Sequence, residues 1–262
     1  VASAGGYGID AGNVNTANVT LGINSKTLST LTVDVSDGNV KVDFVTDADG
    51  SYRLSLSGSA DLKRGIADAE LLGVSDLDLS GTRAANHLIG NKGNNVLSGE
   101  GSADLIEGGA GRDVVSGGTG YDKLYGGAGN DQLSGGRDGD NLSGGTGADR
   151  LYGNAGRDKL YGGAGDDTLN GSSGNDRLIG GNGADQFIFT GGRDVIVDFE
   201  NNVDVIAISA ARAGGDTVSV SDLLDMAHIE DGNAVFDFGG GHTLTINDVT
   251  NLGVLENDLL VL

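Results

Sequence analysis

The nine residues GGAGNDQLS (Gly126–Ser134) decide the fold, because the chain repeats their pattern without interruption. From Gly99 to Ile188 the sequence divides into ten consecutive nine-residue units (10 × 9 = 90 residues). Position one of every unit is Gly, position six is Asp and position eight is apolar. A fixed period of this kind is typical of stacked architectures, in which a unit buries its apolar residue only against neighbouring units.

Composition and charge narrow the possible partners. The chain has 262 residues, 49 of them glycine, with no cysteine or proline and a formal net charge of −22. This charge argues against nucleic acid or an anionic membrane surface as a partner. No run of eighteen apolar residues occurs, so the sequence predicts no membrane span, and the lack of cysteine excludes disulfides and thiolate sites.

The repeat pattern divides the chain into three predicted parts. Two weaker units begin at Gly81 and Gly90 and carry Asn86 and Asn95 at position six, so we interpret them as an N-terminal cap of the repeats. We therefore expect an N-terminal β-rich module over residues 1–80, a repeat domain over 81–188 and a C-terminal cap over 189–262. The start VASAGGYGID has no Met and no basic region followed by an apolar core, so we expect a piece of a longer chain.

The flanking segments show strand and helix patterns of their own. Residues 31–35, 40–44 and 52–56 alternate apolar and polar side chains across turns, which predicts a β-meander, and residues 76–81 predict a strand that feeds the repeats. Residues 62–74 favour a short helix, and residues 220–228 favour another that begins at a Ser or Asp cap. Residues 233–238 and 242–246 flank three glycines and predict a hairpin.

The residue types within each unit point to a hard cation. Carboxylates and backbone carbonyls, without His or Cys, suit Ca²⁺ better than Zn²⁺. Glycines at positions one, two and four let the turn adopt positive φ and direct carbonyl groups inward, while position six supplies negative charge. The candidate carboxylate ligands are Asp104, Asp113, Asp122, Asp131, Asp140, Asp149, Asp158, Asp167, Asp176 and Asp185.

The loop glycines are the second part of the predicted site. The candidates at positions two and four are Gly109, Gly111, Gly118, Gly120, Gly127, Gly129, Gly145, Gly147, Gly163 and Gly165. Positions seven to nine form a short strand whose position-eight residue enters the core. Two units, eighteen residues, then complete one coil and place each unit over the next but one.

A single unit cannot bind an ion by itself, because the site needs a stacked neighbour. Each ion lies between two stacked turns, so six coils leave at most about five gaps on each side. Without cations the acidic loops repel one another, and a glycine-rich chain is costly to order. We therefore expect several bound Ca²⁺ ions and folding that is coupled to their binding.

These units resemble the GGxGxDxUx nonapeptide of RTX proteins, over residues 81–188. The resemblance implies an all-β fold, a right-handed parallel β-roll with Ca²⁺ in its turns, in which loop carbonyls and the position-six Asp are ligands and each Asp is shared between neighbouring ions. Residues 194–209, 232–248 and 256–262 also resemble the segment that follows such repeats in serralysin-like exoproteins. In that family the segment closes the roll and carries an uncleaved signal for the type I secretion machinery.

Some units depart from the pattern. Gly is replaced at position two by Glu100, Asn154 and Ser172, and at position four by Ser102 and Asp138. In GGRDGD the glycine has moved to Gly139, which weakens the prediction of ion sites beside that loop. Asn86 and Asn95 make the first sites the weakest. Asp198 and Asp204 either bind a terminal ion or cap strands.

Other interpretations of these motifs fit less well. A disordered glycine-rich linker does not explain a strict Asp and a strict apolar residue in ten units. No lysine follows a glycine, so no phosphate-binding GK[ST] loop exists. Residues 46–53 suggest the start of an EF-hand, but no Gly stands at the sixth loop position and no Glu closes the loop, so a hairpin turn fits better. The three His are isolated and no GxSxG or Cys nucleophile occurs, so we expect no catalysis by this chain.

Three functional hypotheses remain open. The first is a calcium-binding β-roll from the C-terminal part of a protein exported by type I secretion, which folds on meeting extracellular Ca²⁺. The second is a calcium-stabilised cell-surface module, such as part of an S-layer or adhesin, and the third is the non-catalytic part of an exoenzyme such as a protease, lipase or epimerase. All three place the chain outside the cell or on its surface. Tyr125, Tyr152 and Tyr161 stand at position nine, and further expected partners are other copies of the chain or a cell-surface polysaccharide.

Overall fold

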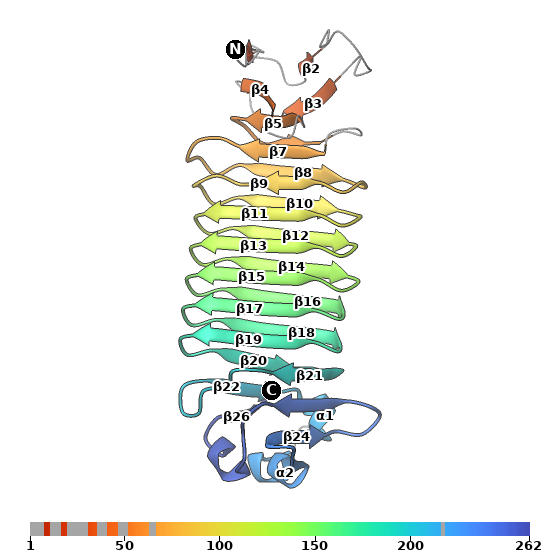
Figure 1. Cartoon of the computed structure of the whole chain (residues 1–262), viewed down its shortest axis with the longest axis vertical. Coiled ribbons are helices and arrows are strands. Elements are labelled where there is room, and N and C mark those ends of the chain that lie inside the picture. The colour runs from red at the N-terminus through yellow and green to blue at the C-terminus, as the bar shows by residue number, and fades with distance from the viewer. Residues whose placement is uncertain are drawn as a thin grey trace.

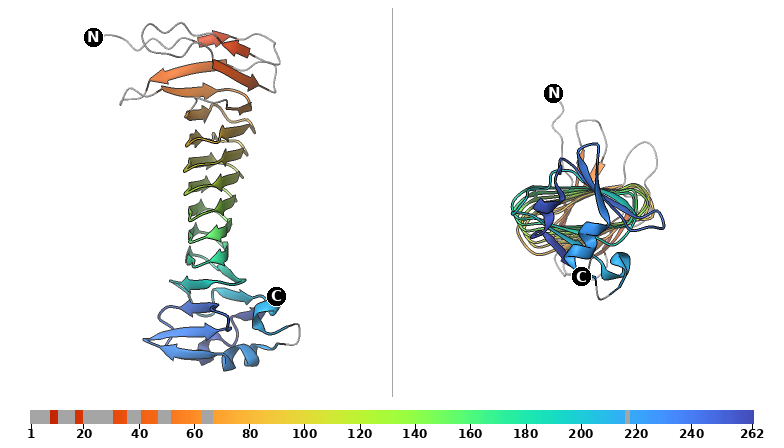
Figure 2. Two further views of the ribbon diagram at one scale, coloured as in Figure 1. Left: turned by 90° about the vertical axis from the view of Figure 1, so that its right-hand side faces the viewer. Right: turned by 90° about the horizontal axis from the view of Figure 1, so that it is seen from below.

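The computed structural model describes residues 8–10, 17–19, 31–35, 41–46, 52–62, 67–215 and 218–262. Over most of this length the chain winds into a flat coil that alternates between two facing β-sheets (Figures 1 and 2). Strands with odd numbers from β5 to β21 lie in one sheet, and strands with even numbers from β6 to β22 lie in the other. The architecture is an all-β parallel β-roll, as the sequence predicts.

The first sheet has fourteen strands. In spatial order they are β1 (Gly8–Asp10), β4 (Lys41–Thr46), β5 (Tyr52–Leu56), β7 (Asp68–Leu71), β9 (His87–Ile89), β11 (Leu105–Ala110), β13 (Lys123–Ala128), β15 (Asn141–Thr146), β17 (Lys159–Ala164), β19 (Arg177–Asn182), β21 (Arg193–Ile196), β25 (Thr243–Ile246), β24 (Asn233–Asp237) and β23 (Ala227–Glu230).

The second sheet has twelve strands. They are β2 (Ala17–Val19), β3 (Leu31–Val35), β6 (Ala60–Asp61), β8 (Asp78–Thr82), β10 (Val96–Glu100), β12 (Val114–Thr119), β14 (Gln132–Arg137), β16 (Arg150–Gly156), β18 (Thr168–Gly174), β20 (Gln186–Phe189), β22 (Val205–Ile208) and β26 (Leu259–Val261).

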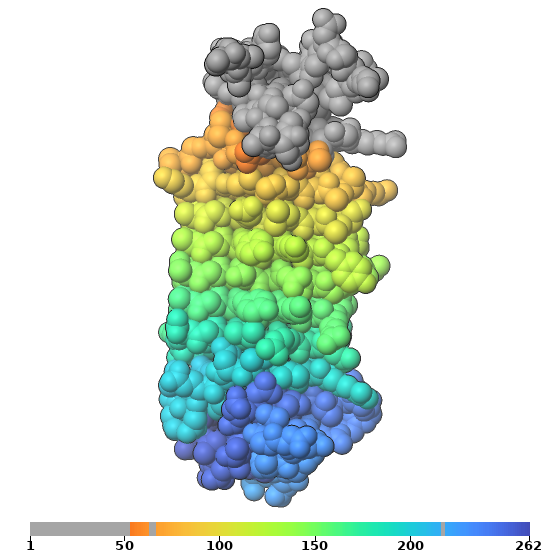
Figure 3. All heavy atoms as spheres, in the orientation of Figure 1, coloured from red at the N-terminus to blue at the C-terminus, as the bar shows by residue number. Residues whose placement is uncertain are grey.

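Successive coils stack in an eighteen-residue register. Leu124 pairs with Leu142 in the first sheet, and Leu133 pairs with Leu151 in the second. Each pairing joins the same position of units n and n+2, as the sequence predicts. The stack forms a column of layers about 4.8 Å apart (Figure 3).

The core is one row of apolar side chains from each sheet. From Leu88 to Leu169 every position-eight residue has 0 % of its surface exposed. Its neighbours at positions seven and nine point outward, because side chains alternate along a strand. The core is therefore continuous along the roll but only two side chains thick, so no single coil can form it.

Parallel pairing continues beyond residues 81–188 at both ends. It begins at the pairs β5–β7 and β6–β8 and ends at β21–β25 and β22–β26. Antiparallel strands flank it, with β1, β4 and β5 at one end and β25, β24 and β23 at the other. The domain boundaries at 80 and 188 remain predictions.

The predicted hairpin across residues 31–44 is wrong. Strand β3 pairs with β2 and β6, whereas β4 pairs with β1 and β5, so the chain passes from one sheet to the other between them. The alternation of side chains specifies two strands but not their partners. The next predicted hairpin, β4 with β5, is confirmed.

The helix predicted over residues 62–74 is also wrong. Residues 63–66 lie outside the described part, and Asp68–Leu71 form strand β7 between β5 and β9. Ala69 and Leu71 are buried while Asp68 and Glu70 are partly exposed, a period of two that matches the coils on either side. Pairing with two neighbours overrides the local preference for helix.

The C-terminal elements follow the sequence more closely. Helix α2 (Val220–Asp225) begins at Ser219 with a capping box to Asp222, and β24 and β25 form the predicted hairpin. Helix α1 (Ala210–Ala213) and the 3-10 turn η1 (Leu252–Leu255) were not predicted. Within the described ranges no helix is long and apolar enough to cross a bilayer.

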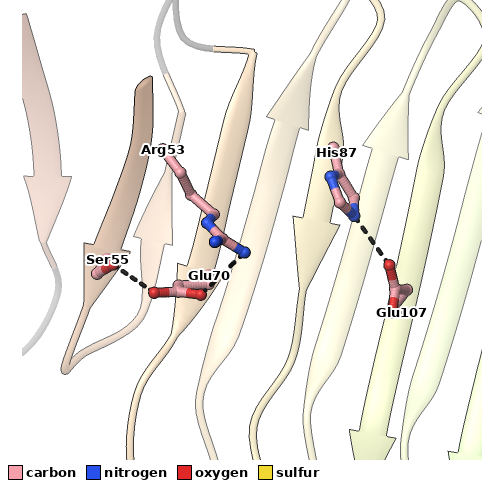
Figure 4. A network of polar contacts seen from close by, with 5 residues as sticks. All are labelled: Arg53, Ser55, Glu70, His87 and Glu107. Carbon is pink, nitrogen blue, oxygen red and sulfur yellow. Dashed lines mark hydrogen bonds and ion pairs between the residues drawn. The ribbon is translucent and has the colours of Figure 1, made fainter. Parts of the chain in front are cut away.

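Polar contacts join the outer faces of the first coils (Figure 4). Glu70 on β7 accepts from Ser55 and pairs with Arg53 at 3.1 Å, both on β5. His87 on β9 contacts Glu107 on β11 at 2.9 Å. This histidine therefore has a partner on the adjacent coil.

Candidate metal centre

The position-six aspartates form two straight rows, one on each edge of the roll. We call the edge where odd-numbered strands such as β13 and β17 begin the odd-strand edge, which faces the viewer in the left view of Figure 2. The opposite edge, where β14 and β16 begin, is the even-strand edge. The odd-strand row is Asp104, Asp122, Asp140, Asp158, Asp176 and Asp194, and the even-strand row is Asp113, Asp131, Asp149, Asp167, Asp185 and Asp204.

Each carboxylate joins its coil to the preceding coil. The Oδ1 atom of Asp122 accepts a hydrogen bond from the backbone N–H of Asp104, and Asp131 does the same for Asp113. The pattern continues along both rows with N···O distances of 2.7–3.0 Å. Position six therefore serves the backbone as well as any ion.

The second carboxylate oxygen is buried and has no hydrogen-bond partner. This holds for Oδ2 of Asp104, Asp113, Asp122, Asp131, Asp140, Asp149, Asp158, Asp167, Asp176, Asp185 and Asp194. Every one of these residues is at most 3 % exposed. An unpaired buried carboxylate oxygen costs several kcal/mol, unless a cation or a proton neutralises it.

A carbonyl oxygen of the next coil lies beside this carboxylate oxygen in the eight units from Asp104 to Asp167. A Cβ built on Gly99 would lie 2.3 Å from Oδ2 of Asp104 and 2.7 Å from the carbonyl oxygen of Gly117. Gly126 shows the same arrangement, at 2.5 Å from Asp131 Oδ2 and 2.6 Å from the Gly144 carbonyl. Two oxygen acceptors thus converge where a side chain would otherwise be.

This contact corrects one prediction about glycine. None of the position-one glycines from Gly81 to Gly180 adopts positive φ, so position one excludes a side chain because of space and not because of backbone conformation. Positions two and four follow the prediction: all ten candidate glycines there have φ between +106° and +126°. At Gly127 a Cβ would also lie 2.1 Å from the Gly109 carbonyl.

The five replacements of glycine keep the same backbone conformation. Glu100, Ser102, Asp138, Asn154 and Ser172 all have φ between +69° and +75°. The loop with Asp138 therefore turns like its neighbours, and Asp140 remains in the odd-strand row with an unpartnered Oδ2. The backbone there gives no sign of the disruption that the shifted Gly139 suggests.

Burial raises the pKa of these carboxyl groups. Desolvation by burial is the largest cause of the rise. The backbone N–H that donates to each carboxylate lowers its pKa, and neighbouring carboxylates of the same row commonly raise it further. The pKa rises to about 7 at Asp104, Asp140, Asp167 and Asp176, to about 6 at Asp113, Asp131, Asp158 and Asp185, and to about 8 at Asp194. At Asp122, Asp149 and Asp204 it is also raised. Burial and the neighbouring carboxylates thus disfavour the charged form of these aspartates, which a bound cation would stabilise.

The donor set fits a hard divalent cation. The described residues contain no cluster of three or more His, Cys, Asp or Glu side chains that could hold a metal, so an ion between coils would combine carboxylate Oδ2 atoms with loop carbonyls. Oxygen-only sites of this kind favour Ca²⁺. When bound, it supplies the positive charge that the buried rows lack.

The two asparagine units differ from the aspartate units. Asn86 Oδ1 accepts from Thr82 N–H and its Nδ2 donates to the Ala67 carbonyl. Asn95 makes the equivalent bonds to Asn91 N–H and the Leu77 carbonyl. Both ends of each amide have protein partners, so position six needs no cation in these two units. A parallel coil precedes them, with β7 beside β9 and β8 beside β10, so they do not end the roll as the sequence predicts.

Sequence reasoning missed Asp194 as a member of the odd-strand row. The nine-residue frame continues past Ile188 and puts Gly192 at position four, Asp194 at position six and buried Ile196 at position eight, although Phe189 and Thr190 replace glycine at positions one and two. Asp204 ends the other row after one inserted residue, and its Oδ2 accepts from Glu200 N–H. Asp198 accepts from the N–H groups of Gly180 and Gly181, so both carboxylates bind backbone N–H groups at the end of the repeats.

The fold and these rows define a class of protein: a parallel β-roll whose repeated loops offer oxygen sites to a hard cation. The family model of the RTX calcium-binding nonapeptide repeat matches four copies in this chain, over residues 80–115, 107–142, 134–169 and 161–196. Residues 80–196 therefore consist of RTX calcium-binding nonapeptide repeats.

Comparison with whole proteins adds little. No curated protein matches the chain. Among solved structures, the chain is similar to the extracellular lipase LipA from Serratia marcescens, with 16 % identity and a TM-score of 0.39. The match covers 76 % of this chain and 45 % of the lipase chain, so this chain spans less than half of that protein.

Asp167 and its neighbour Asp166 allow a matched test of the rows. Each accepts one backbone N–H from an adjacent coil, but Asp167 is buried with a free Oδ2 and Asp166 is exposed. Asp167→Asn should remove at least one bound Ca²⁺ or weaken it at least about tenfold, whereas Asp166→Asn should leave the number of ions unchanged. Equilibrium dialysis measures both, and equal ion numbers with equal affinities in the two variants would refute the role of position six.

The raised pKa values predict how the calcium-free chain responds to pH. A carboxyl whose pKa is higher in the roll than in the unfolded chain binds its proton more tightly when folded, so stability is present at low pH and is lost as pH rises. In EGTA, circular dichroism should therefore show more β-structure at pH 4 than at pH 8, with the change centred between these limits. An unchanged spectrum across this range, with light scattering excluding aggregation, would contradict the burial of empty carboxylates.

Proposed function

We propose that this chain is a calcium-dependent folding module of an exported protein, unfolded where Ca²⁺ is scarce and folded into the roll where it is abundant. The observation that carries the proposal is the set of buried carboxylate oxygens without hydrogen-bond partners. Eleven such charges cannot be buried together in a calcium-free roll at neutral pH, because each adds a desolvation cost and repels its row neighbours.

The chain has few other sources of stability. Its core is one side chain deep in each sheet, it has no cysteine, and 49 glycines raise the entropy lost on folding. Extracellular calcium modules typically bind at about 10⁻⁴–10⁻³ M, a level far above that of cytosol. Calcium outside the cell would thus provide the free energy that the sequence lacks.

The same features suit export in an unfolded state. A net charge of −22 keeps the calcium-free chain expanded and soluble, and the resemblance of residues 189–262 to the serralysin-like segment suggests type I secretion. In the roll, this segment adds β25 and β26 to the two sheets and so covers the last coil. The role proposed here is non-catalytic.

Chelation tests the coupling of folding to calcium. In excess EGTA at pH 7.5 the chain should lose its β-sheet circular dichroism, and added Ca²⁺ should restore it cooperatively, while Mg²⁺ at the same concentration should not. Cooperativity follows because each coil stacks on the next. A β-sheet spectrum that persists in EGTA would rule the proposal out.

Export is tested separately in a cell that carries a type I machinery. Removal of residues 213–262 should abolish appearance of the chain in the medium, whereas Leu223→Ala, which disturbs only the packing of α2, should leave export intact. Normal export of the truncated chain would remove the secretion signal from the proposal but would leave calcium-coupled folding untouched.

A further inference from the structure

The two edges of the roll carry different side chains at positions five and seven. On the even-strand edge, position-five side chains bond to the next coil: Asn130 accepts from Ala148 N–H and Asp166 from Ala184 N–H. On the odd-strand edge no such bond is recorded among the described residues from Gly99 onward. The side chains at these two positions there include Tyr121, Lys123, Arg157, Lys159, Arg177 and Arg193 and no acid.

This collection of cations is unusual for so acidic a chain. The protein carries 38 acidic and 16 basic residues, yet five bases gather on one edge. Among the described residues no carboxylate forms an ion pair with Arg157, Lys159 or Arg177, and Arg193 donates Nε–H to the Gly241 carbonyl. The charges are thus available to an external anion.

The edge is hollowed where these cations lie. One hollow of about 590 Å³ is lined by Arg157, Lys159, Arg177 and Arg193, together with Asp158 and Asp176 of the odd-strand row, whose charge a bound cation would offset. A second, of about 570 Å³, extends from Tyr121 past Asn141 and shares Arg157 and Lys159 with the first. Asp138 and Asp140 also line it. Together they form a groove along the long axis of the roll, which we call the edge groove.

The spacing of the groove suits a linear polymer. Lys159 and Arg177 are directly paired on neighbouring strands, so successive cations are about 4.8 Å apart along the axis. This step is close to the length of one sugar ring. A chain of uronic acids that runs along the groove would therefore place a carboxylate near a cation at successive coils.

Aromatic side chains provide the second half of a sugar site. Tyr121, at one end of the groove, is 70 % exposed. Tyr125 and Tyr161 are 45 % and 38 % exposed and follow Lys123 and Lys159 by two residues on the same outer face. Exposed tyrosine rings offer flat apolar surfaces with a polar edge, which complement the faces of sugar rings.

We propose that the edge groove binds an acidic polysaccharide, with Arg157, Lys159, Arg177 and Arg193 contacting its carboxylates and Tyr121 stacking on a sugar ring. A nucleic acid fits less well, because its phosphates would extend beyond the groove over the acidic remainder of the surface. An acidic peptide would use the charges but not the tyrosines.

The chain itself offers a matched control. Arg157 and Arg177 stand at positions five and seven of the odd-strand edge, and Arg112 and Arg150 stand at the same positions of the even-strand edge. Arg157→Ser with Arg177→Ser, and Arg112→Ser with Arg150→Ser, change the net charge equally. Circular dichroism in Ca²⁺ confirms that both variants retain the roll.

Titration calorimetry of the calcium-loaded chain with a short oligogalacturonate tests the groove. The Arg157/Arg177 variant should lose about tenfold or more in affinity, the Arg112/Arg150 variant should stay within about twofold of the parent, and a neutral malto-oligosaccharide of equal length should not bind. Tyr121→Ala should weaken binding without changing its salt dependence.

Three results would overturn the proposal. Equal losses in the two double variants would show attraction by net charge alone. Equal binding of the neutral sugar would remove the cations from recognition. Binding of polyglutamate or single-stranded DNA as tight as that of the uronate would show a general anion surface and not a polysaccharide site.

Discussion

The structure depends on how the charge on one buried atom is neutralised, the Oδ2 of the aspartate at position six. Its partner Oδ1 holds the backbone of the preceding coil, so the side chain cannot turn outward to water without breaking the stack. Oδ2 is therefore fixed inside the roll beside a carbonyl oxygen of the following coil. Two acceptors without a donor repel each other, and repetition along two edges multiplies the cost. The geometry that joins the coils is thus the same geometry that requires a cation between them.

Glycine at position one belongs to this constraint. A Cβ there would occupy the space between Asp104 Oδ2 and the Gly117 carbonyl. Positions two and four need glycine for a different reason, since their φ is positive, and here Glu100 and Asn154 show that other residues are accepted. This difference explains the sequence itself: position one never varies from Gly99 to Gly180, whereas positions two and four do.

The sequence predicts the roll well because each coil obeys the same local rule. A strict Asp, a strict apolar residue and a period of nine suffice to place Leu124 over Leu142. It predicts the flanks less well, because pairing there is not local: nothing in residues 31–44 indicates that β3 and β4 join different sheets. Asp194 was missed because Phe189 and Thr190 replace the first two glycines of its unit, although Gly192, Asp194 and Ile196 keep positions four, six and eight.

Positions five and seven are among those that this architecture leaves free, with positions three and nine. The core uses position eight, the coil contacts use position six, and the turn uses positions one, two and four, so outward side chains at five and seven vary without disturbing the stack. On the even-strand edge, Asn130 and Asp166 accept hydrogen bonds from the backbone of the next coil. On the odd-strand edge, charged and aromatic side chains lie along a groove. Because the coils stack in register, side chains at the same position of successive coils lie about 4.8 Å apart. The outer surface of the roll therefore presents side chains at a regular spacing along its long axis. A polymer with a similar repeat is the ligand that such a surface can distinguish from a single small anion.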